Sequence, residues 1–102
     1  MRIIHGGTVK DWAKKYPDAA EPLAVWHTNA ENASWQSLHE VRQLYPHADA
    51  VEVASGRTVV VFNIRGNRYR LVTAIHYNRQ VLYTLRFMTH AEYSKDRWKE
   101  TL

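Results

Sequence analysis

Arginines dominate the residues that could do chemistry in the second half of this sequence. Residues 53–102 hold seven arginines and two lysines against three acidic residues, whereas residues 1–52 hold five basic and seven acidic residues. A guanidinium group binds phosphate through two parallel hydrogen bonds, so such a cluster favours a phosphate-rich partner. The net charge of +4 therefore predicts binding of a polyanion such as RNA by the second half.

A two-residue alternation places several of these arginines on one face of two predicted strands. Arg68 and Arg70 share a face of one strand, and Arg86 lies on the corresponding face of the next. If the apolar faces cover the helices, these arginines and Arg65 in the preceding hairpin point to an exposed, concave sheet face that can cradle phosphates. The alternative is an ordinary solvated sheet face.

Arg70 differs from the other arginines because apolar residues flank it in a strand expected at the centre of the sheet. Burying an unpaired guanidinium is costly, so Arg70 needs either an anionic partner or open water.

His90 and Tyr93 are candidates for proton transfer. They lie three residues apart, on one side of a predicted C-terminal helix, and Lys95 follows two residues later. Histidine exchanges a proton near neutral pH, tyrosine can donate one, and a helix N-terminus favours an anion such as phosphate. The alternative is that His90 merely begins the helix and Tyr93 packs against its neighbours.

Metal and cofactor chemistry has little support in the sequence. The histidines are His5, His27, His39, His47, His76 and His90. They form no i, i+4 pair, and the absence of cysteine removes thiol nucleophiles and cysteine-containing zinc motifs. The glycine-rich phosphate loops and the G-x-S-x-G motif of serine hydrolases are also missing. We therefore expect neither a protein-bound metal nor a cofactor.

Helices are predicted in the first half of the chain. The expected elements are a short strand over 2–4 with a turn at Gly6–Gly7, a helix from Thr8 to Tyr16 stopped by Pro17, a helix capped by Asp18 and Glu21 that ends near Asn29, and a helix capped by Ser37 and Glu40 that ends at Pro46.

Strands are predicted in the second half. They form an antiparallel meander over 50–54, 58–64, 68–77 and 80–89. In the last strand, alternation gives an apolar, core-facing set of Val81, Tyr83, Leu85 and Phe87. Thr89 and Glu92 then form a capping box for a helix over 90–100. Helices followed by strands predict an α+β fold, with the helices packed on one face of a twisted antiparallel sheet.

Composition limits the remaining possibilities. The chain has 102 residues, of which 45% are apolar and 24% charged, which is typical of one globular domain over 1–102. The longest apolar run, Val59–Phe62, is far short of the ~20 residues that span a bilayer, so we expect a cytoplasmic protein. The four tryptophans are expected to pack in or around the core, although Trp35, in a polar loop, could contact a partner.

Two segments carry a resemblance to a known family. FNIRGNRYRLVTAI (Phe62–Ile75) and YTLRFMTHAEYSK (Tyr83–Lys95) resemble the HigB branch of the RelE-like toxins, as does the LYPHAD segment at the end of the third helix. The R-G-N-x-x-R-L hairpin and the terminal T-H-A-E-Y-x-K motif are its most specific parts.

The resemblance implies a microbial RNase-type fold and a bacterial type II toxin that inhibits translation by cutting mRNA on the ribosome. It implies metal-free attack of a ribose 2′-OH on the adjacent phosphate, with Arg70 as the phosphate clamp and His90 and Tyr93 as proton-transfer groups. It also implies inhibition by a helix-turn-helix antitoxin. Some relatives carry two lysines on the preceding strand, where this chain has Val61 and Asn63.

A lysine base on that strand is therefore in doubt. The alternatives are Arg65, Lys95 or His90 as the base, or orientation of the substrate by the ribosome itself. The residues expected to bind RNA are Asn63, Arg65, Arg68, Arg86 and Lys95.

Two other functions compete with the toxin. One is a non-catalytic RNA-binding domain with the outline of double-stranded RNA binders. The other is a subunit whose basic face meets an acidic protein.

Overall fold

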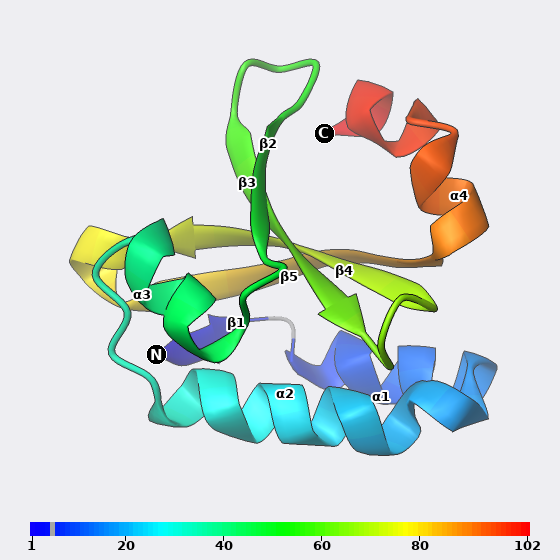
Figure 1. Ribbon diagram of the computed structural model, residues 1–102, viewed down its shortest axis with the longest axis horizontal. Coiled ribbons are helices and arrows are strands. Elements are labelled where there is room, and N and C mark those ends of the chain that lie inside the picture. The colour runs from blue at the N-terminus through cyan, green and yellow to red at the C-terminus, as the bar shows by residue number, and fades with distance from the viewer. Residues whose placement is uncertain (5) are drawn as a thin grey trace.

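A five-stranded sheet organises the computed structural model, which describes residues 1–4 and 6–102 (Figure 1). The strands are β1 (Arg2–Ile4), β2 (Asp49–Glu52), β3 (Thr58–Ile64), β4 (Tyr69–His76) and β5 (Val81–Thr89). The helices are α1 (Gly6–Lys15), α2 (Ala20–Asn32), α3 (Leu38–Leu44) and α4 (His90–Ser94), with short 3₁₀ helices η1 (Pro17–Ala19), η2 (Tyr77–Arg79) and η3 (Arg97–Thr101).

The spatial order of the strands is β1-β5-β4-β3-β2. The meander from β2 to β5 is antiparallel, which confirms the predicted strands and the α+β class. β1 adds a strand that runs parallel to β5, with Arg2 opposite Val81 and Ile4 opposite Tyr83, so the sheet as a whole is mixed.

The main core lies between the sheet and the helices α1, α2 and α3. Its most buried large side chains are Leu23, Trp26, Phe62, Leu71 and Leu82, each at most 1% exposed. Trp35 belongs to this core as well. It is 5% exposed and its ring stacks on that of Phe62, with 6.1 Å between centroids, which confirms the expectation that it packs in the core.

A β-bulge in β5 overturns part of the predicted face assignment. Val72 lies opposite Arg86, but the next residue, Thr73, lies opposite Thr84, so Leu85 is the extra residue. The alternation therefore reverses on the N-terminal side of Leu85. Leu82, predicted on the other face, is fully buried in the helix-side core, whereas Phe87 faces this core as predicted.

The boundaries of α1 and α2 differ from the predictions, whereas the predicted cap of α3 is present. α1 begins at Gly6, so the turn predicted at Gly6–Gly7 is wrong. Asp18 does not cap α2: its N-cap is Ala19, which makes no side-chain cap, and the helix continues to Asn32. In α3, the Ser37 side chain accepts from the Glu40 N–H as predicted, and the helix ends before Pro46.

The C-terminal segment covers part of the sheet face opposite α1, α2 and α3, which we call the second sheet face. The predicted Thr89–Glu92 capping box is present, but α4 ends at Ser94. Asp96 takes a left-handed conformation with φ 61°, after which η3 turns back over the sheet. The buried Trp98 of η3 joins a second apolar cluster on this face. Its other buried members are Val53, Val59, Val61, Val72 and Met88. The C-terminal segment therefore covers part of this face, and the prediction of a fully exposed, concave face is wrong.

None of the helices in the described part of the chain is both long and apolar enough to cross a membrane.

Candidate functional site

Arg70 lies near the start of β4, the central strand, and therefore toward one end of the second sheet face. The strand register places it between Asn63 of β3 and Met88 of β5 in one row across the sheet. Its side chain is turned toward the β3–β4 hairpin. Nη1 donates to the main-chain oxygens of Asn67 and Tyr69, at 3.1 Å each, and Nη2 donates to Asn67 Oδ1.

The aromatic ring of Tyr93 covers the Arg70 guanidinium, with 5.5 Å between Cζ and the ring centroid. Tyr93 is itself held in place, because its ring stacks on Trp98 at 5.2 Å and the Trp98 indole N–H donates to the Tyr93 carbonyl at 3.1 Å. The capping box at Thr89 starts α4 in a fixed orientation. Arg70 and Tyr93, predicted to act together, are therefore in contact.

Arg70 carries a positive charge without an acidic partner. Although only 8% of the residue is exposed, no ion pair among the described residues involves it, and its acceptors are neutral oxygens. Desolvation lowers its pKa below the usual value, opposed by the nearby Tyr93. Arg70 was predicted to need either an anionic partner or open water, and the described residues provide neither. A bound anion would supply the missing negative charge.

Burial also governs the acid–base properties of Tyr93. It raises the pKa of the phenol above the ordinary value of 10.0, and the carboxylates of Asp49 and Asp96 raise it further. The cations of Lys99 and Arg70 act in the opposite direction. At neutral pH the Tyr93 hydroxyl therefore keeps its proton and can donate it.

His90 lies at the same end of the sheet, as the first residue of α4. Its backbone N–H donates to the Arg68 carbonyl at 3.0 Å. The exposed ring has Ser94 Oγ as a hydrogen-bond neighbour, 3.3 Å from Nδ1. An imidazole in this position is open to solvent and to a bound substrate.

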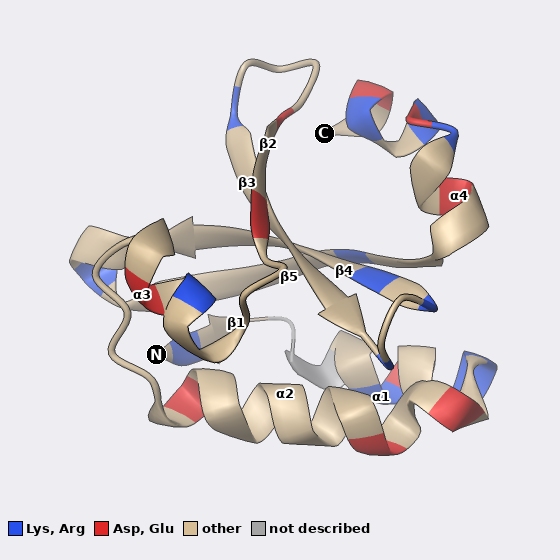
Figure 2. Cartoon of the chain, in the orientation of Figure 1, with Lys and Arg blue, Asp and Glu red and all other residues tan. Residues whose placement is uncertain are grey.

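A basic depression of about 360 Å³ lies against β5 and the C-terminal segment, and its lining includes Met88, the register partner of Arg70, and Trp98, whose ring stacks on Tyr93. It is lined by Arg86, Phe87, Met88, Glu92, Lys95, Arg97 and Trp98. Two of its cations, Arg86 and Lys95, were predicted to bind RNA, and Arg97 is a third. The basic positions of β4, β5 and the C-terminal segment all lie toward the same end of the molecule (Figure 2).

Arg65 and Arg68 are placed differently from the prediction. Both reach toward the helical layer, where Asp18 Oδ2 lies 2.9 Å from Arg65 Nη1 and 3.4 Å from Arg68 Nε. Their predicted place on the second sheet face beside Arg70 and Arg86 is therefore wrong. The reason is that Arg68 precedes the first residue of β4, so the alternation does not apply to it, and Arg65 lies in the turn.

Sequence reasoning missed Asn67 and Trp98 as parts of this site. Asn67 orients Arg70, and the G-N dipeptide in the hairpin suggested only a turn. Trp98 supports Tyr93, but its position depends on the left-handed conformation of Asp96, which no pattern in the sequence indicates.

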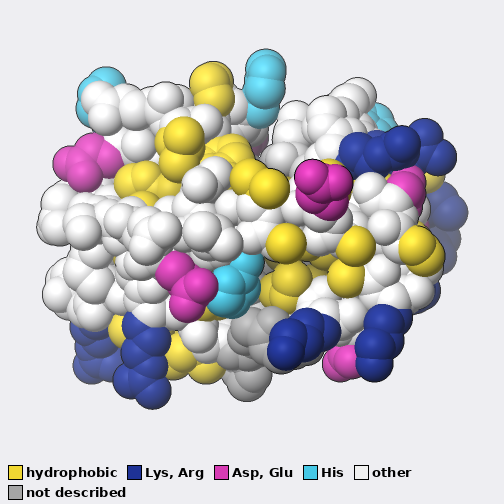
Figure 3. All heavy atoms as spheres, turned by 90° about the horizontal axis from the view of Figure 1, so that it is seen from below, with side chains coloured by type: hydrophobic (Ala, Val, Ile, Leu, Met, Phe, Trp, Pro, Cys, Tyr) yellow, Lys and Arg dark blue, Asp and Glu magenta, His cyan; other side chains and the backbone are white. Residues whose placement is uncertain are grey.

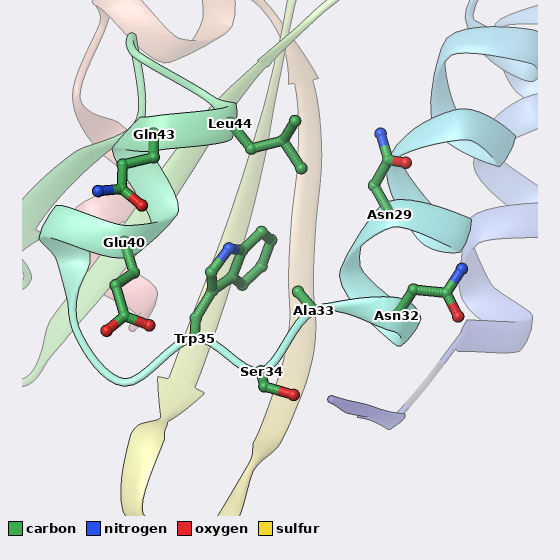
Figure 4. Close-up of a pocket in the computed structure, with 8 residues that line it drawn as sticks. All are labelled: Asn29, Asn32, Ala33, Ser34, Trp35, Glu40, Gln43 and Leu44. Carbon is green, nitrogen blue, oxygen red and sulfur yellow. The ribbon is translucent and has the colours of Figure 1, made fainter.

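A larger depression lies elsewhere. A cleft of about 490 Å³ separates the end of α2 from α3, with the Trp35 indole pointing into it and Leu44 directed toward Asn29 (Figure 4). Its lining includes no arginine or lysine. On the helical face, apolar patches occupy the middle and the basic side chains lie toward the rim (Figure 3). Both features make this side unsuited to a polyanion.

Metal ligands are not grouped within residues 1–4 and 6–102, where no three His, Asp or Glu side chains come together at a possible metal site. His5, one of the six histidines, lies outside the described residues.

The fold and this site define a small α+β protein with a basic sheet face centred on a buried arginine, the architecture expected of RelE-like toxins. A profile described as HigB toxin, the RelE-like toxic component of a toxin–antitoxin system, matches residues 19–96. The chain therefore belongs to the HigB toxin family.

Curated relatives agree with this assignment. The chain is 27% identical over 93 residues to the mRNA interferase toxin HigB of Escherichia coli (strain K12), a match that covers 91% of this chain and 88% of that protein. The mRNA interferase HigB of Shigella flexneri matches with the same identity and coverage.

Proposed function

We propose that this chain is an endoribonuclease that cleaves mRNA on the ribosome, using its own side chains and no metal ion. The observation that carries this proposal is the buried, charged Arg70, whose hydrogen-bond acceptors are all neutral and whose ring neighbour is a tyrosine. A phosphorane gains negative charge as it forms, and a fixed guanidinium stabilises it most where water is excluded. Family membership and the names of the relatives support an mRNA substrate.

In the proposed reaction, the ribose 2′-oxygen attacks the adjacent phosphorus and the bond from phosphorus to the 5′-oxygen breaks. The products are a 2′,3′-cyclic phosphate and a 5′-hydroxyl. The 2′-OH proton must be accepted and the leaving oxygen must receive one. Because the raised pKa of Tyr93 keeps its phenol protonated, we assign donation to Tyr93 and acceptance to His90.

RNA on either side of the cut is expected to follow the cations of the second sheet face. Arg86 and Lys95 line the basic depression against β5, and Asn63 is the register partner of Arg70 on β3. Arg65 and Arg68 retain solvent-exposed side chains, 44% and 64% respectively, so they can still meet phosphates at the periphery.

The proposal includes a cytoplasmic location, where translating ribosomes are found, and a helix-turn-helix antitoxin as the inhibitory partner. Membership in the toxin–antitoxin family supports an antitoxin partner. Co-purification of the two gene products, followed by loss of cleavage on adding the antitoxin, tests this part.

The test of the activity compares end-labelled mRNA with and without programmed ribosomes. Wild type, Arg70→Ala and the matched control Arg79→Ala, an exposed arginine of η2, are incubated in parallel, and the 3′ ends are analysed. We expect ribosome-dependent cuts with 2′,3′-cyclic phosphate ends from wild type and Arg79→Ala, and none from Arg70→Ala. If wild type leaves mRNA intact on active ribosomes, the catalytic proposal fails and a non-catalytic RNA binder becomes the better explanation.

A further inference from the structure

Asp18 connects the helical layer to the β3–β4 hairpin. It lies in η1, between α1 and α2, and its carboxylate gathers three side chains from a segment about fifty residues away. Arg65 Nη1 is 2.9 Å and Arg68 Nε is 3.4 Å from Oδ2, and the Tyr69 hydroxyl donates to Oδ1 at 2.6 Å. We call these four residues the Asp18 clamp.

Both sides of the Asp18 clamp are anchored in the core. On the helical side, Ala19 is fully buried and Pro17 restricts the backbone. On the sheet side, Tyr69 is 5% exposed, and its ring packs against those of Tyr16 and Phe87 with 5.1 Å between centroids in each case. The carboxylate therefore joins two surfaces that cannot easily move apart.

The hairpin held by the clamp has a strained backbone. Arg65 has a φ of 55°, a left-handed conformation that is uncommon for a residue with a side chain. Such a conformation persists when surrounding contacts determine it. The ion pair with Asp18 is one such contact, and the hydrogen bond from the Arg68 N–H to the Arg65 carbonyl, at 3.2 Å, is another.

Asn67 lies between the two clamped arginines and is the residue that orients Arg70. Its carbonyl and side-chain oxygens both accept from the Arg70 guanidinium. The position of Arg70 thus depends on the conformation of a four-residue turn whose two ends are tied to Asp18.

We propose that Asp18 is a positioning residue for Arg70, acting through the hairpin and Asn67. This inference rests on the proposed function, in which Arg70 stabilises the transition state. It assigns a role in the reaction to a residue of the helical layer that touches neither Arg70 nor, in the proposed reaction, the cleaved phosphate.

The kinetic test uses Asp18→Ala, the more conservative Asp18→Asn, and the control Glu31→Gln, which removes the carboxylate that His27 Nδ1 contacts at 3.0 Å on α2. For Asp18→Ala we expect kcat per folded protein to fall about tenfold, since a misaligned Arg70 guanidinium stabilises the transition state less. We expect KM to stay within about twofold, because the released Arg65 and Arg68 still attract RNA. Asp18→Asn should fall less, and Glu31→Gln should match wild type.

A double-substitution cycle tests the route through Asn67. If Asp18 acts through Asn67, Asn67→Ala lowers kcat as well, and the double variant falls no further than the more impaired single variant. Multiplicative losses, or a fall in KM with unchanged kcat, would overturn the inference. The latter result would mean that Asp18 merely neutralises two RNA-binding arginines.

A measurement on the free protein separates this inference from the proposed function. The Arg70 Nε–Hε resonance in ¹⁵N NMR spectra should shift or broaden in Asp18→Ala and Asn67→Ala and remain unchanged in Glu31→Gln. If the resonance does not respond to Asp18→Ala in a folded protein, positioning is wrong whether or not wild type cleaves mRNA. If wild type does not cleave but the resonance responds, only the proposed function fails.

Discussion

Three arginines lie within six residues of one another, and Arg70 differs from the other two in its environment. Arg65 and Arg68 are exposed and paired with the Asp18 carboxylate, whereas Arg70 is buried and bonded only to neutral oxygens. An exposed ion pair contributes little to stability but occupies its cations. A buried guanidinium without a carboxylate is costly, yet its charge is available to a ligand. Charge alone therefore does not distinguish Arg70, the arginine proposed to stabilise the reaction, from Arg65 and Arg68; the presence or absence of a carboxylate partner does.

The strongest test of this comparison replaces each arginine by lysine. Arg70→Lys keeps the charge but loses the planar fork that Asn67 orients, so we expect cleavage to fall by about a hundredfold. Arg65→Lys keeps an exposed ion pair and should stay within about twofold of wild type. Single-turnover cleavage on programmed ribosomes measures both. Equal losses in the two variants would contradict the distinction.

A carboxylate placed opposite Arg70 should pair with its guanidinium, as the Asp18 carboxylate pairs with that of Arg65. Asn63 is its register partner, and directly opposed side chains on neighbouring strands lie within reach of each other. We expect Asn63→Asp to reduce cleavage by about tenfold or more by competing with the phosphate, and to raise the unfolding temperature. The control Asn63→Ala should not raise that temperature. Thermal unfolding and cleavage assays on the same samples decide the outcome.

A smaller effect is expected on the salt dependence of RNA binding, which should differ between arginines with and without a carboxylate partner. Arg86 lines the basic depression and forms no ion pair among the described residues, so Arg86→Gln should reduce the slope of log affinity against log salt by about one. Arg65→Gln should reduce it by less than half as much, because Asp18 already neutralises part of its charge. Titration of a non-cleavable 2′-deoxy oligonucleotide at several salt concentrations measures these slopes.

The smallest expected effect is on the pH dependence of stability. The pKa of Tyr69 is raised by its hydrogen bond to Asp18, and that of Tyr93 by burial. Phenols with raised folded pKa values stabilise the protein fully below the unfolded value of about 10, and this contribution is lost as pH rises through the folded pKa. Wild type should lose stability above that pH.

The two tyrosines should respond separately to substitution. Tyr69→Phe and Tyr93→Phe should each reduce the alkaline loss of stability. Asp18→Asn should reduce the contribution of Tyr69 and leave that of Tyr93 nearly unchanged, because Asp18 contributes only to the former. Urea unfolding between neutral and strongly alkaline pH checks these changes, and an equal response of both tyrosines to Asp18→Asn would argue against two separate environments.

Local features of the site followed from the sequence with little error. The Thr89–Glu92 capping box needs only residues within one helical turn, and it is present as predicted. The antiparallel strands followed from alternating apolar residues and turn residues. The cost of burying Arg70 among apolar neighbours also identified it as exceptional.

Errors in the prediction arose where a long-range contact overrode a local pattern. Asp18 has the spacing of a helix cap, but the hairpin arginines and Tyr69 offer its carboxylate stronger partners. The bulge at Leu85 reverses an alternation that continues unbroken in the sequence.

The sequence by itself determined the order of helices and strands, the basic second half and the unusual position of Arg70 among apolar neighbours, because these depend on neighbouring residues and on composition. Only the tertiary structure decided which arginine has a carboxylate partner and which has none among the described residues. That choice depends on η1 meeting the β3–β4 hairpin and on η3 folding back so that Trp98 holds Tyr93 over Arg70. Contacts between segments so far apart in the chain leave no periodic signal, since only the packed core brings them together.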